Sequence, residues 1–383
     1  MSEWKVYQLG EVCSRLRSGK GIKADFVSDT GEYPVIGGNG VRGFTDSYNF
    51  EGQAAVIGRQ GAYCGNVRFY EGKAYMTEHA VVVVGNELAD TYYLACLLSR
   101  MHLGNLSGQS AQPGISVQTL SKQILRLPSI LYQKQVSAVI KTLDDKIAVN
   151  KKICENLEAQ AQTLFKHWFV DFAPFKDGKF VESDLGLIPE GWRVKSLSSV
   201  ADYVNGLAMQ KFRPEEGEEG LPVLKIKELG QGGFDANSEL CSPSKIGDKY
   251  TINDGDIIFS WSGTLMVRIW CGGKCGLNQH LFVVVPNNYP KWFVYLWTRH
   301  HLDNFIRIAK DKAVTMGHIK RGELDKALVA IPDIDNLNKI DVLMEPIHQQ
   351  IIQRELEFRR LSSLRDTLLP KLMSGEIKVG DVK

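Results

Sequence analysis

Two kinds of hydrophobic pattern alternate along the chain. Short apolar runs bounded by glycine and polar residues predict strands at residues 52–57, 66–70, 78–84 and 124–127. Similar runs predict strands at residues 255–260, 266–270, 280–285 and 327–331. A short helix is predicted within each group, at residues 92–102 and 292–305. We therefore expect two α+β regions in which strands dominate.

A different pattern covers residues 132–169, which contain no glycine or proline. Apolar side chains recur there at alternating intervals of four and three residues, the heptad seam of a coiled coil. The seam consists of Leu143, Ile147, Cys154, Leu157, Ala161, Leu164 and Trp168, with Asn150 in the remaining slot. It returns 204 residues later at Ile347, Ile351, Phe358, Leu361, Leu368 and Leu372, interrupted by Arg354 and Arg365.

Each stretch predicts a long helix that needs a partner. A helix of about 36 residues is roughly 54 Å long and leaves one apolar stripe exposed when alone. We expect the two helices to pair antiparallel; the alternative is that each packs on its own globular region. We expect Asn150 to fix the register or face solvent, and the two interrupting arginines to face solvent. Pro346 predicts a kink or a late start in the second helix.

The globular regions also repeat each other. WKVYQL at residues 4–9 returns as WRVKSL 188 residues later, and PVI at 34–36 returns as PVL at the same shift. AVIGRQG at 55–61 returns as IIFSWSG after 202 residues, and LP at 127–128 as IP after 204. The growing shift places the insertions in loops, where added length costs little. Two such copies indicate a pseudo-twofold arrangement.

These patterns divide the chain into five segments. They are a first globular domain at 1–130, a central spacer helix at 131–172, a linker at 173–190, a second globular domain at 191–334 and a C-terminal spacer helix at 335–383. The linker is rich in glycine and proline, as expected of a surface crossover. The predicted fold class is α+β, with two pseudo-twofold-related α/β domains separated by an antiparallel coiled coil of two long helices.

Composition narrows the function classes. A length of 383 residues suits two or three domains, and the formal charge of +2 excludes a broadly basic protein. Nucleic-acid binding would need local patches or charge from partners. No apolar run approaches the roughly 18 residues of a membrane span, and residues 1–5 do not resemble a secretion signal. Seven cysteines, an odd number, predict reduced thiols in a cytoplasmic protein.

Catalytic signatures are missing from the sequence. It contains no GxxxxGK[ST], HExxH or GxSxG, and no GxGxxG between a strand and a helix. Cys271, Cys275 and His280 lack the spacing of a zinc site, so we expect no metal. His79 and His280 precede equivalent strands and are expected to be structural. We predict a non-catalytic chain without a cofactor of its own.

Polar loops around glycine are the remaining candidates for a binding site. Arginine can read guanine, and asparagine or glutamine can read adenine, through paired hydrogen bonds. Lysine and serine can hold phosphates, although surface loops are polar in any protein. The DNA-binding candidates in the first domain are Lys20, Lys23, Asn39, Arg42, Arg59, Gln60, Tyr63, Gln109, Ser110 and Gln112. Those in the second are Lys211, Arg213, Lys225, Lys227, Ser260, Trp261, Ser262, Asn278, Gln279, Lys310, Lys312, Thr315 and His318.

Two different loop sets on one scaffold suit a two-part, asymmetric DNA target. A rod of the predicted length fits half-sites about one DNA turn, roughly 34 Å, apart.

Several strings resemble the specificity subunit of type I restriction–modification systems. They are LRDTLLPKLMSGEI at 364–377, QTLFKHWFVDF at 162–172, LGLIPEGW at 185–192 and QSAQPGIS at 109–116. The resemblance covers the whole chain. The second copy departs from it in one place, with Met316-Gly317-His318 where the first has Gln-Pro-Gly.

The resemblance implies two target-recognition domains and an antiparallel spacer that docks two methyltransferase subunits. These partners would bind S-adenosylmethionine, and translocating restriction subunits would use ATP and Mg²⁺. Whether restriction subunits join stays open. The runner-up is the recognition subunit of another phage-defence or modification assembly, or a stand-alone DNA-binding regulator. A third reading is a coiled-coil adaptor that never touches DNA.

Overall fold

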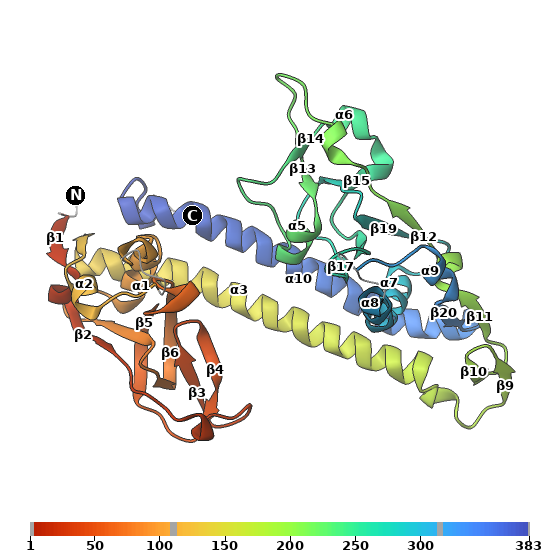
Figure 1. Cartoon of the computed structure of the whole chain (residues 1–383), viewed down its shortest axis with the longest axis horizontal. Coiled ribbons are helices and arrows are strands. Elements are labelled where there is room, and N and C mark those ends of the chain that lie inside the picture. Colours follow the sequence, from red (N-terminus) through yellow and green to blue (C-terminus); the bar gives the residue numbers. More distant parts are fainter. Residues whose placement is uncertain (1–3, 108–112, 312–316, 382–383) are drawn as a thin grey trace. The chain divides into compact units, whose positions relative to one another are not determined.

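The computed structural model describes residues 4–107, 113–311 and 317–381, which form two compact units (Figure 1). Unit 1 comprises residues 1–146 and 362–383, and unit 2 comprises residues 147–361. Two long helices, α3 (Ile130–Phe165) and α10 (Ile334–Ser374), each contribute one part to each unit. Each unit therefore contains one globular region and a stretch of paired helix.

Unit 1 is built on a six-stranded sheet in the order β2-β7-β5-β6-β3-β4, in which only β3 and β6 pair in parallel. Its strands are β2 (Cys13–Ser18), β3 (Tyr33–Gly37), β4 (Gly40–Thr45), β5 (Phe50–Gly58), β6 (Val67–Met76) and β7 (Ala80–Gly85). Strands β1 (Lys5–Gln8) and β8 (Ile124–Leu127) form a separate antiparallel pair. Helices α1 (Thr91–Ser99) and α2 (Val117–Ser121) share one core with β5, β7 and α3.

The sheet of unit 1 bends at two facing glycines. Gly52 in β5 pairs with Gly72 in β6, and their φ angles are +117° and +127°, a region open mainly to glycine. The end of β6 then returns toward β2, where the Lys20 amide donates a 2.9 Å hydrogen bond to the Met76 carbonyl. Because the sheet curls in this way, loops from both ends of its strands meet on one rim.

Unit 2 repeats this sheet in two pieces. One has the order β12-β19-β16-β17 and the other β14-β13-β18-β15. The strands of the first are β12 (Ala201–Asn205), β16 (Ile257–Ser260), β17 (Met266–Ile269) and β19 (Leu281–Pro286). Those of the second are β13 (Leu221–Leu224), β14 (Leu240–Cys241), β15 (Thr251–Ile252) and β18 (Cys275–Leu277).

The two pieces correspond to a single sheet in unit 1. Strands β15 and β16 stand where β5 is continuous, and β17 and β18 stand where β6 is continuous. Val223 and Leu224 of β13 pair in parallel with Gly276 and Leu277, as Val35 and Ile36 do with Tyr75 and Met76. The break falls at Gly255 and Gly273, both with positive φ, close to the positions of the bent pair in unit 1. The side chain of Trp270 is buried at this break, and its indole Nε1 donates to the Gly273 carbonyl.

The remaining elements of unit 2 surround these sheets. Strands β11 (Arg193–Ser196) and β20 (Leu328–Ile331) pair as β1 and β8 do, and β9 (Phe180–Ser183) and β10 (Gly186–Pro189) form a hairpin. The helices are α4 (Leu197–Val200), α5 (Ile226–Gln231), α6 (Pro243–Ile246), α7 (Lys291–His300), α8 (Leu302–Asp311) and α9 (Gly322–Lys326).

The predicted strands are confirmed, although most of them begin or end a few residues away from the predicted bounds. One helix prediction is wrong. The segment at 292–305 is two helices, α7 and α8, separated at His301. A ring nitrogen of His301 lies 2.9 Å from the Leu328 carbonyl, which ties this turn to β20. Apolar residues keep their helical spacing through this turn, so the hydrophobic pattern alone does not reveal the break between the two helices.

The stretch between the two copies is more structured than a surface crossover. Helix α3 ends in a π-helical turn, Lys166–Val170, and the β9–β10 hairpin follows. Phe169 of this turn is 2% exposed, and its ring centroid lies 5.2 Å from that of Phe165 and 5.7 Å from that of Trp192. The aromatic contacts fix the end of α3 to the core of unit 2.

Helices α3 and α10 pair antiparallel within each unit. In unit 1 the Tyr132 hydroxyl donates to the Leu372 carbonyl, while Asp144 pairs with Arg365, nearer the N-terminus of α10. In unit 2 the Cys154 thiol contacts the Ile351 carbonyl. As numbers rise on α3 they fall on α10, which confirms the predicted pairing. Both helices also pack on the cores of the globular regions. The alternative prediction, that each helix packs on a globular region, therefore describes a second set of contacts that exists beside the helix pairing.

The predicted seam faces inward along its whole length. Every seam position on the two helices is buried or half-buried, including Leu143, Ile147, Leu157, Leu164, Trp168, Ile347, Ile351, Phe358, Leu361, Leu368 and Leu372. Asn150 is fully buried, so a solvent-facing role for it is wrong. Arg354 and Arg365 are half-buried and ion-paired with Glu357 and Asp144, which corrects their assignment to solvent. Helix α10 runs unbroken from Ile334 through Pro346, which excludes the late start.

Candidate nucleic-acid interface

Loops from distant parts of unit 1 meet at one edge, which we call rim 1. It comprises residues 18–23, 37–42, 58–66, 77–79 and 113–115. Backbone hydrogen bonds join these segments or the strand residues that flank them: Gly19 N to Ala80 O (3.0 Å), Lys20 N to Met76 O (2.9 Å), Thr77 N to Ile36 O (2.9 Å), Arg59 N to His79 O (2.9 Å), Ile115 N to Arg59 O (3.0 Å) and Gly61 N to Pro113 O (3.1 Å). The rim is therefore held by the main chain, which leaves its side chains free to differ.

Unit 2 has the same construction at rim 2, residues 205–213, 225–227, 260–263, 277–280 and 317–319. The matched bonds are Gly206 N to Leu281 O (3.0 Å), Leu207 N to Leu277 O (2.9 Å), Ile319 N to Trp261 O (3.1 Å) and Gly263 N to Gly317 O (2.9 Å). Bridges between Gln60 and Gly114 and between Ser262 and His318 also correspond. The repeat seen in the sequence thus extends to individual hydrogen bonds.

A glycine is required where the first loop of each rim crosses the sheet. A Cβ atom at Gly19 would lie 2.0 Å from the Met76 carbonyl oxygen. One at Gly206 would lie 2.2 Å from the Asn278 carbonyl oxygen. Both distances are far below van der Waals contact, so the close approach of backbone to backbone excludes any side chain there.

Most candidates on rim 1 reach solvent. The exposed ones are Lys20, Lys23, Asn39, Arg42, Gln60 and Tyr63, and Arg59 is half-exposed. Arg68, which the sequence reasoning missed, donates hydrogen bonds from its guanidinium to the carbonyl (2.5 Å) and side-chain oxygen (3.1 Å) of Asn39. Arg68 thereby fixes the orientation of Asn39. No sequence signal distinguishes it from other strand arginines.

The candidates on and beside rim 2 fall into two groups. Lys211, Arg213, Lys227, Lys310 and His318 are exposed, and Lys225, Trp261 and Gln279 are half-exposed. Ser260, Ser262 and Asn278 are at most 5% exposed. This burial corrects their assignment as DNA contacts, because a buried side chain cannot present a polar group to DNA. Instead the Ser262 hydroxyl lies 3.2 Å from His280 Nδ1, and Asn278 accepts a 3.3 Å hydrogen bond from the His280 amide.

Trp261 occupies the position that Arg59 has on rim 1. Its indole Nε1 donates a 3.0 Å hydrogen bond to Asn205, and its ring stacks on Phe282 at 5.6 Å. A large flat side chain is thus held half-exposed at the rim, whereas rim 1 presents a guanidinium. The remaining candidates, Gln109, Ser110, Gln112, Lys312 and Thr315, lie outside the described residues.

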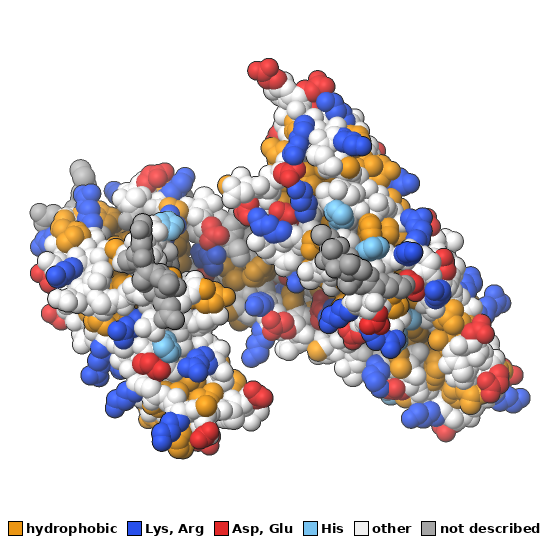
Figure 2. All heavy atoms as spheres, viewed as in Figure 1, with side chains coloured by type: hydrophobic (Ala, Val, Ile, Leu, Met, Phe, Trp, Pro, Cys, Tyr) orange, Lys and Arg blue, Asp and Glu red, His pale blue; other side chains and the backbone are white. Residues whose placement is uncertain are grey.

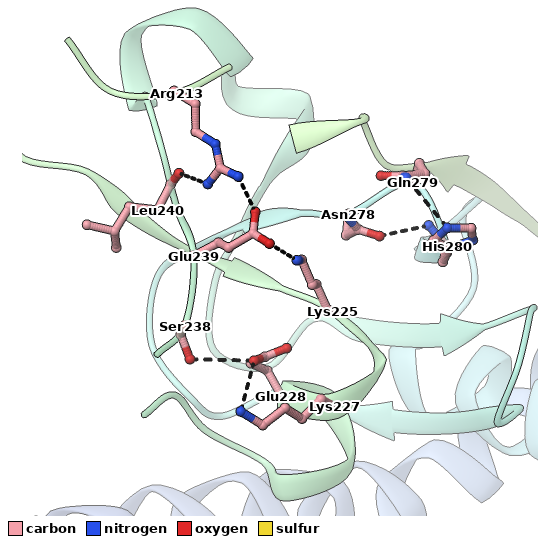
Figure 3. A network of polar contacts seen from close by, with 10 residues as sticks. All are labelled: Arg213, Lys225, Lys227, Glu228, Ser238, Glu239, Leu240, Asn278, Gln279 and His280. Atoms are coloured by element: carbon pink, nitrogen blue, oxygen red, sulfur yellow. Dashed lines mark hydrogen bonds and ion pairs between the residues drawn. The ribbon is translucent and has the colours of Figure 1, made fainter. Parts of the chain in front are cut away.

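Carboxylates accompany the basic residues of rim 2 (Figure 3). Arg213 pairs with Glu239 at 2.6 Å, and Lys225 pairs with the other oxygen of Glu239. Lys227 lies 4.0 Å from Glu228, the pair drawn in Figure 3, and it also pairs with Asp235 at 2.7 Å. The hydrogen bond from Lys225 lowers the pKa of Glu239, and the one from Lys227 lowers the pKa of Asp235. Both acids are therefore ionised at neutral pH.

Metal-binding groups are not gathered anywhere in the described residues: no three His, Cys, Asp or Glu side chains lie close enough to share an ion. Cys271 and Cys275 are buried, and burial raises the pKa of the Cys271 thiol to about 12. Within the same residues, no helix has the length and apolar character to cross a bilayer.

Charge is mixed over the visible face of each unit, where basic and acidic side chains are interspersed (Figure 2). The mixed charge agrees with the net charge of +2. Attraction of an anion such as DNA therefore depends on local groups of basic residues such as those on the rims.

Comparisons with known proteins point to one family. The family model for the type I restriction modification DNA specificity domain matches residues 1–159 and 189–357. The specificity subunit of the MjaIX type I restriction enzyme from Methanocaldococcus jannaschii is 30% identical over 290 residues, covering 73% of this chain and 67% of that protein. The EcoprrI specificity subunit from Escherichia coli is 38% identical over 146 residues, covering 37% of this chain and 36% of that protein.

The fold agrees with a solved structure. The S subunit of a type I restriction–modification system from M. genitalium superimposes with a TM-score of 0.63 at 15% identity, covering 97% of this chain and 96% of that one. The doubled family match covers both globular regions, and the shared fold includes the long helices. This chain therefore belongs to the type I restriction–modification DNA specificity subunit family.

Proposed function

We propose that this chain is the DNA-reading subunit of a type I restriction–modification complex. Each rim reads one part of a bipartite, asymmetric sequence, and the chain itself performs no chemistry. The observation that carries the proposal is the matched set of backbone hydrogen bonds under different exposed side chains. Two recognition domains that bind different sequences are expected to share a backbone scaffold and to differ in the exposed side chains of their rims.

The exposed groups suit two kinds of DNA contact. Arg59 can donate a pair of hydrogen bonds to guanine in the major groove, and Gln60 can both donate to and accept from adenine. Lys20, Lys23, Lys211 and Lys310 are exposed cations suited to phosphates, which set position rather than sequence. Rim 2 offers Trp261 and Gln279 in place of Arg59 and Glu78, so its half-site should differ.

Partner subunits would supply the reaction. The exposed faces of α3 and α10 are continuous helical surfaces suited to docking two methyltransferase subunits, which would bind S-adenosylmethionine and modify adenine. Restriction subunits, where present, would use ATP and Mg²⁺. The recognition subunit of another defence assembly has the same rims but would direct a different reaction.

The test is to produce the chain with its methyltransferase subunits in a host without other adenine methylation, and to map methylated adenines. We expect one asymmetric motif made of two specific parts around a gap. Arg59→Ala should relax one part, and Trp261→Ala the other, with a discrimination loss of about 1–3 kcal/mol per affected base pair. Unmethylated DNA, a contiguous motif, or relaxation of both parts by either variant would contradict the proposal. Binding by the chain alone, as tight as by the complex, would favour a stand-alone regulator.

A further inference from the structure

The acidic residues of rim 2 belong to a segment that rim 1 lacks. In unit 1, β3 and β4 are joined by a two-residue turn, Gly38-Asn39, between the paired residues Gly37 and Gly40. In unit 2, β13 and β14 are joined by residues 225–239, which include α5. Asp235 and Glu239 lie in this longer connection, and Lys225 and Lys227 begin it.

The carboxylates are held in place by the segment itself. The Glu239 carbonyl accepts a 2.8 Å hydrogen bond from the Val223 amide of β13. The Asp235 side chain accepts from the Asn237 amide at 2.8 Å, and the Asp235 amide donates to the Ser238 hydroxyl at 3.0 Å. Glu239 is only 35% exposed at its side chain. The ion pairs are thus formed between positioned groups rather than between two loose surface side chains.

Four cations of rim 1 have no such partners, although His79 on the same rim lies 3.3 Å from the Glu78 carboxylate. Within residues 4–107, 113–311 and 317–381, Lys20, Lys23, Arg42 and Arg59 form no ion pair, whereas Arg213, Lys225 and Lys227 all do. The acids stand close to the cations that DNA would use. A phosphate must therefore displace a carboxylate from each cation and approach the negative charge left behind.

We infer that Glu239 and Asp235 set the sequence discrimination of rim 2 by holding Arg213, Lys225 and Lys227 away from non-specific phosphate contact. This rests on the proposed function, because it assigns the acids a role in DNA reading. DNA of any sequence offers phosphates, and these compete poorly with a fixed carboxylate. Only a matching half-site adds the base contacts that compensate for breaking the pairs. Glu239 and Asp235 are positioning residues in this scheme and touch no reacting group.

The experiment uses the chain assembled with its methyltransferase subunits. Binding to a duplex carrying the mapped motif and to a scrambled duplex is measured over a range of salt concentrations for Glu239→Gln, Asp235→Asn and the unaltered complex. Freeing a cation to bind phosphate adds about 0.9 to the magnitude of the salt slope. We expect Glu239→Gln to steepen the slope on scrambled DNA by up to about 2. Asp235→Asn should steepen it by less than about 1, because Lys227 also lies 4.0 Å from the Glu228 carboxylate.

Affinity for the scrambled duplex should rise about fivefold for Glu239→Gln, while affinity for the motif rises less, so that discrimination falls. Glu219→Gln is the matched control. Glu219 is exposed, forms no ion pair among the described residues, and its substitution makes the same change in net charge. It should leave the slope and the discrimination unchanged. Thermal unfolding of each variant verifies that the fold is retained.

Three outcomes would overturn the inference while leaving the proposed function intact. They are an unchanged salt slope in both variants, an equal increase for Glu219→Gln, and a selective loss of binding to the motif. The last would mean that Glu239 itself reads a base. If the unaltered complex did not distinguish the motif from the scrambled duplex, the proposed function would fail, and the inference with it.

Discussion

Rim 1 and rim 2 share a backbone and differ in the electrostatic state of their surfaces. On rim 1, Lys20, Lys23, Arg42 and Arg59 form no ion pair among the described residues. On rim 2, two carboxylates of the inserted segment, Glu239 and Asp235, pair with three cations. Main-chain hydrogen bonds do not depend on side-chain identity, so they survive divergence of a duplicated scaffold. The difference teaches that a loop insertion can change the charge environment of a rim without changing the main-chain scaffold that holds it.

The units differ in their cores as well. Unit 2 surrounds the end of α3 with aromatic rings, and six of the chain's seven tryptophans, all except Trp4, lie in it. Among the described residues, the core of unit 1 contains no tryptophan; it combines Tyr92 and Tyr93 with aliphatic side chains and Met373, which stands 204 residues after Phe169. Tryptophan fluorescence therefore reports mainly on unit 2, which allows the two units to be followed separately.

The largest effect should come from Phe169→Ala. Phe169 is 2% exposed and contacts several rings, so its removal leaves a cavity costing about 3–5 kcal/mol. Met373→Ala at the matched position should cost less, about 2–3 kcal/mol, because Met373 is smaller and 8% exposed. Denaturant unfolding followed by tryptophan fluorescence and by far-UV circular dichroism checks both. Equal losses would remove the claimed difference between the cores.

The shared scaffold predicts similar losses from Gly19→Ala and Gly206→Ala. Each added methyl group would press on a carbonyl oxygen of the crossing segment, and overpacking of this kind costs about 1–3 kcal/mol. The free energy of unfolding should fall by similar amounts in the two variants. Gly322→Ala, in a position where a Cβ meets no atom within 4 Å and φ is not positive, serves as control for the loss of a glycine. A loss confined to one variant would show that the crossings are not equivalent.

Acidification should weaken unit 2 through buried histidines. Burial lowers the pKa of His348 and of His301 to about 4 in the folded chain, below the usual value near 6.5 in the unfolded chain. The unfolded state therefore binds these protons first, and stability falls as the pH drops from about 6.5 to about 4. His348→Leu should remove about 2 kcal/mol of this pH dependence. Unfolding of the Trp4→Phe background at pH 7 and pH 5 measures it, and an unchanged pH profile would contradict the assignment.

The smallest effects should come from the arginines that interrupt the seam. Arg365 bonds Asp144 across the helix pair of unit 1, and Arg365→Gln should cost about 1 kcal/mol. Arg354 pairs with Glu357 of its own helix in unit 2, and Arg354→Gln should cost less than about 0.5 kcal/mol. Thermal unfolding ranks the two. The reverse order would mean that the pair across the helices does not stabilise unit 1.

The sequence by itself determined the duplication, most of the strands and the two paired helices. These follow from local periodicity: a heptad seam exposes an apolar stripe that must be covered, and the second copy supplies the same stripe in register. Apolar runs such as residues 124–127 are bounded by turns, so their strand assignment needs no distant contact. The loop candidates on rim 1 were found because polar groups around glycine are visible in the sequence.

Only the tertiary structure decided which candidates are exposed on the rims and which are buried in support of the loops. Ser260, Ser262 and Asn278 have the residue types of a reader but are buried, and burial depends on packing between segments far apart in the chain. Arg68 acts on Asn39 across 29 positions, and Glu239 meets Arg213 across 26. Such pairings depend on how the sheets curl and where an insertion folds back, and no local pattern encodes either. The residue type determines which hydrogen bonds and ion pairs a side chain can form, whereas its neighbours in space determine whether it is exposed and unpaired.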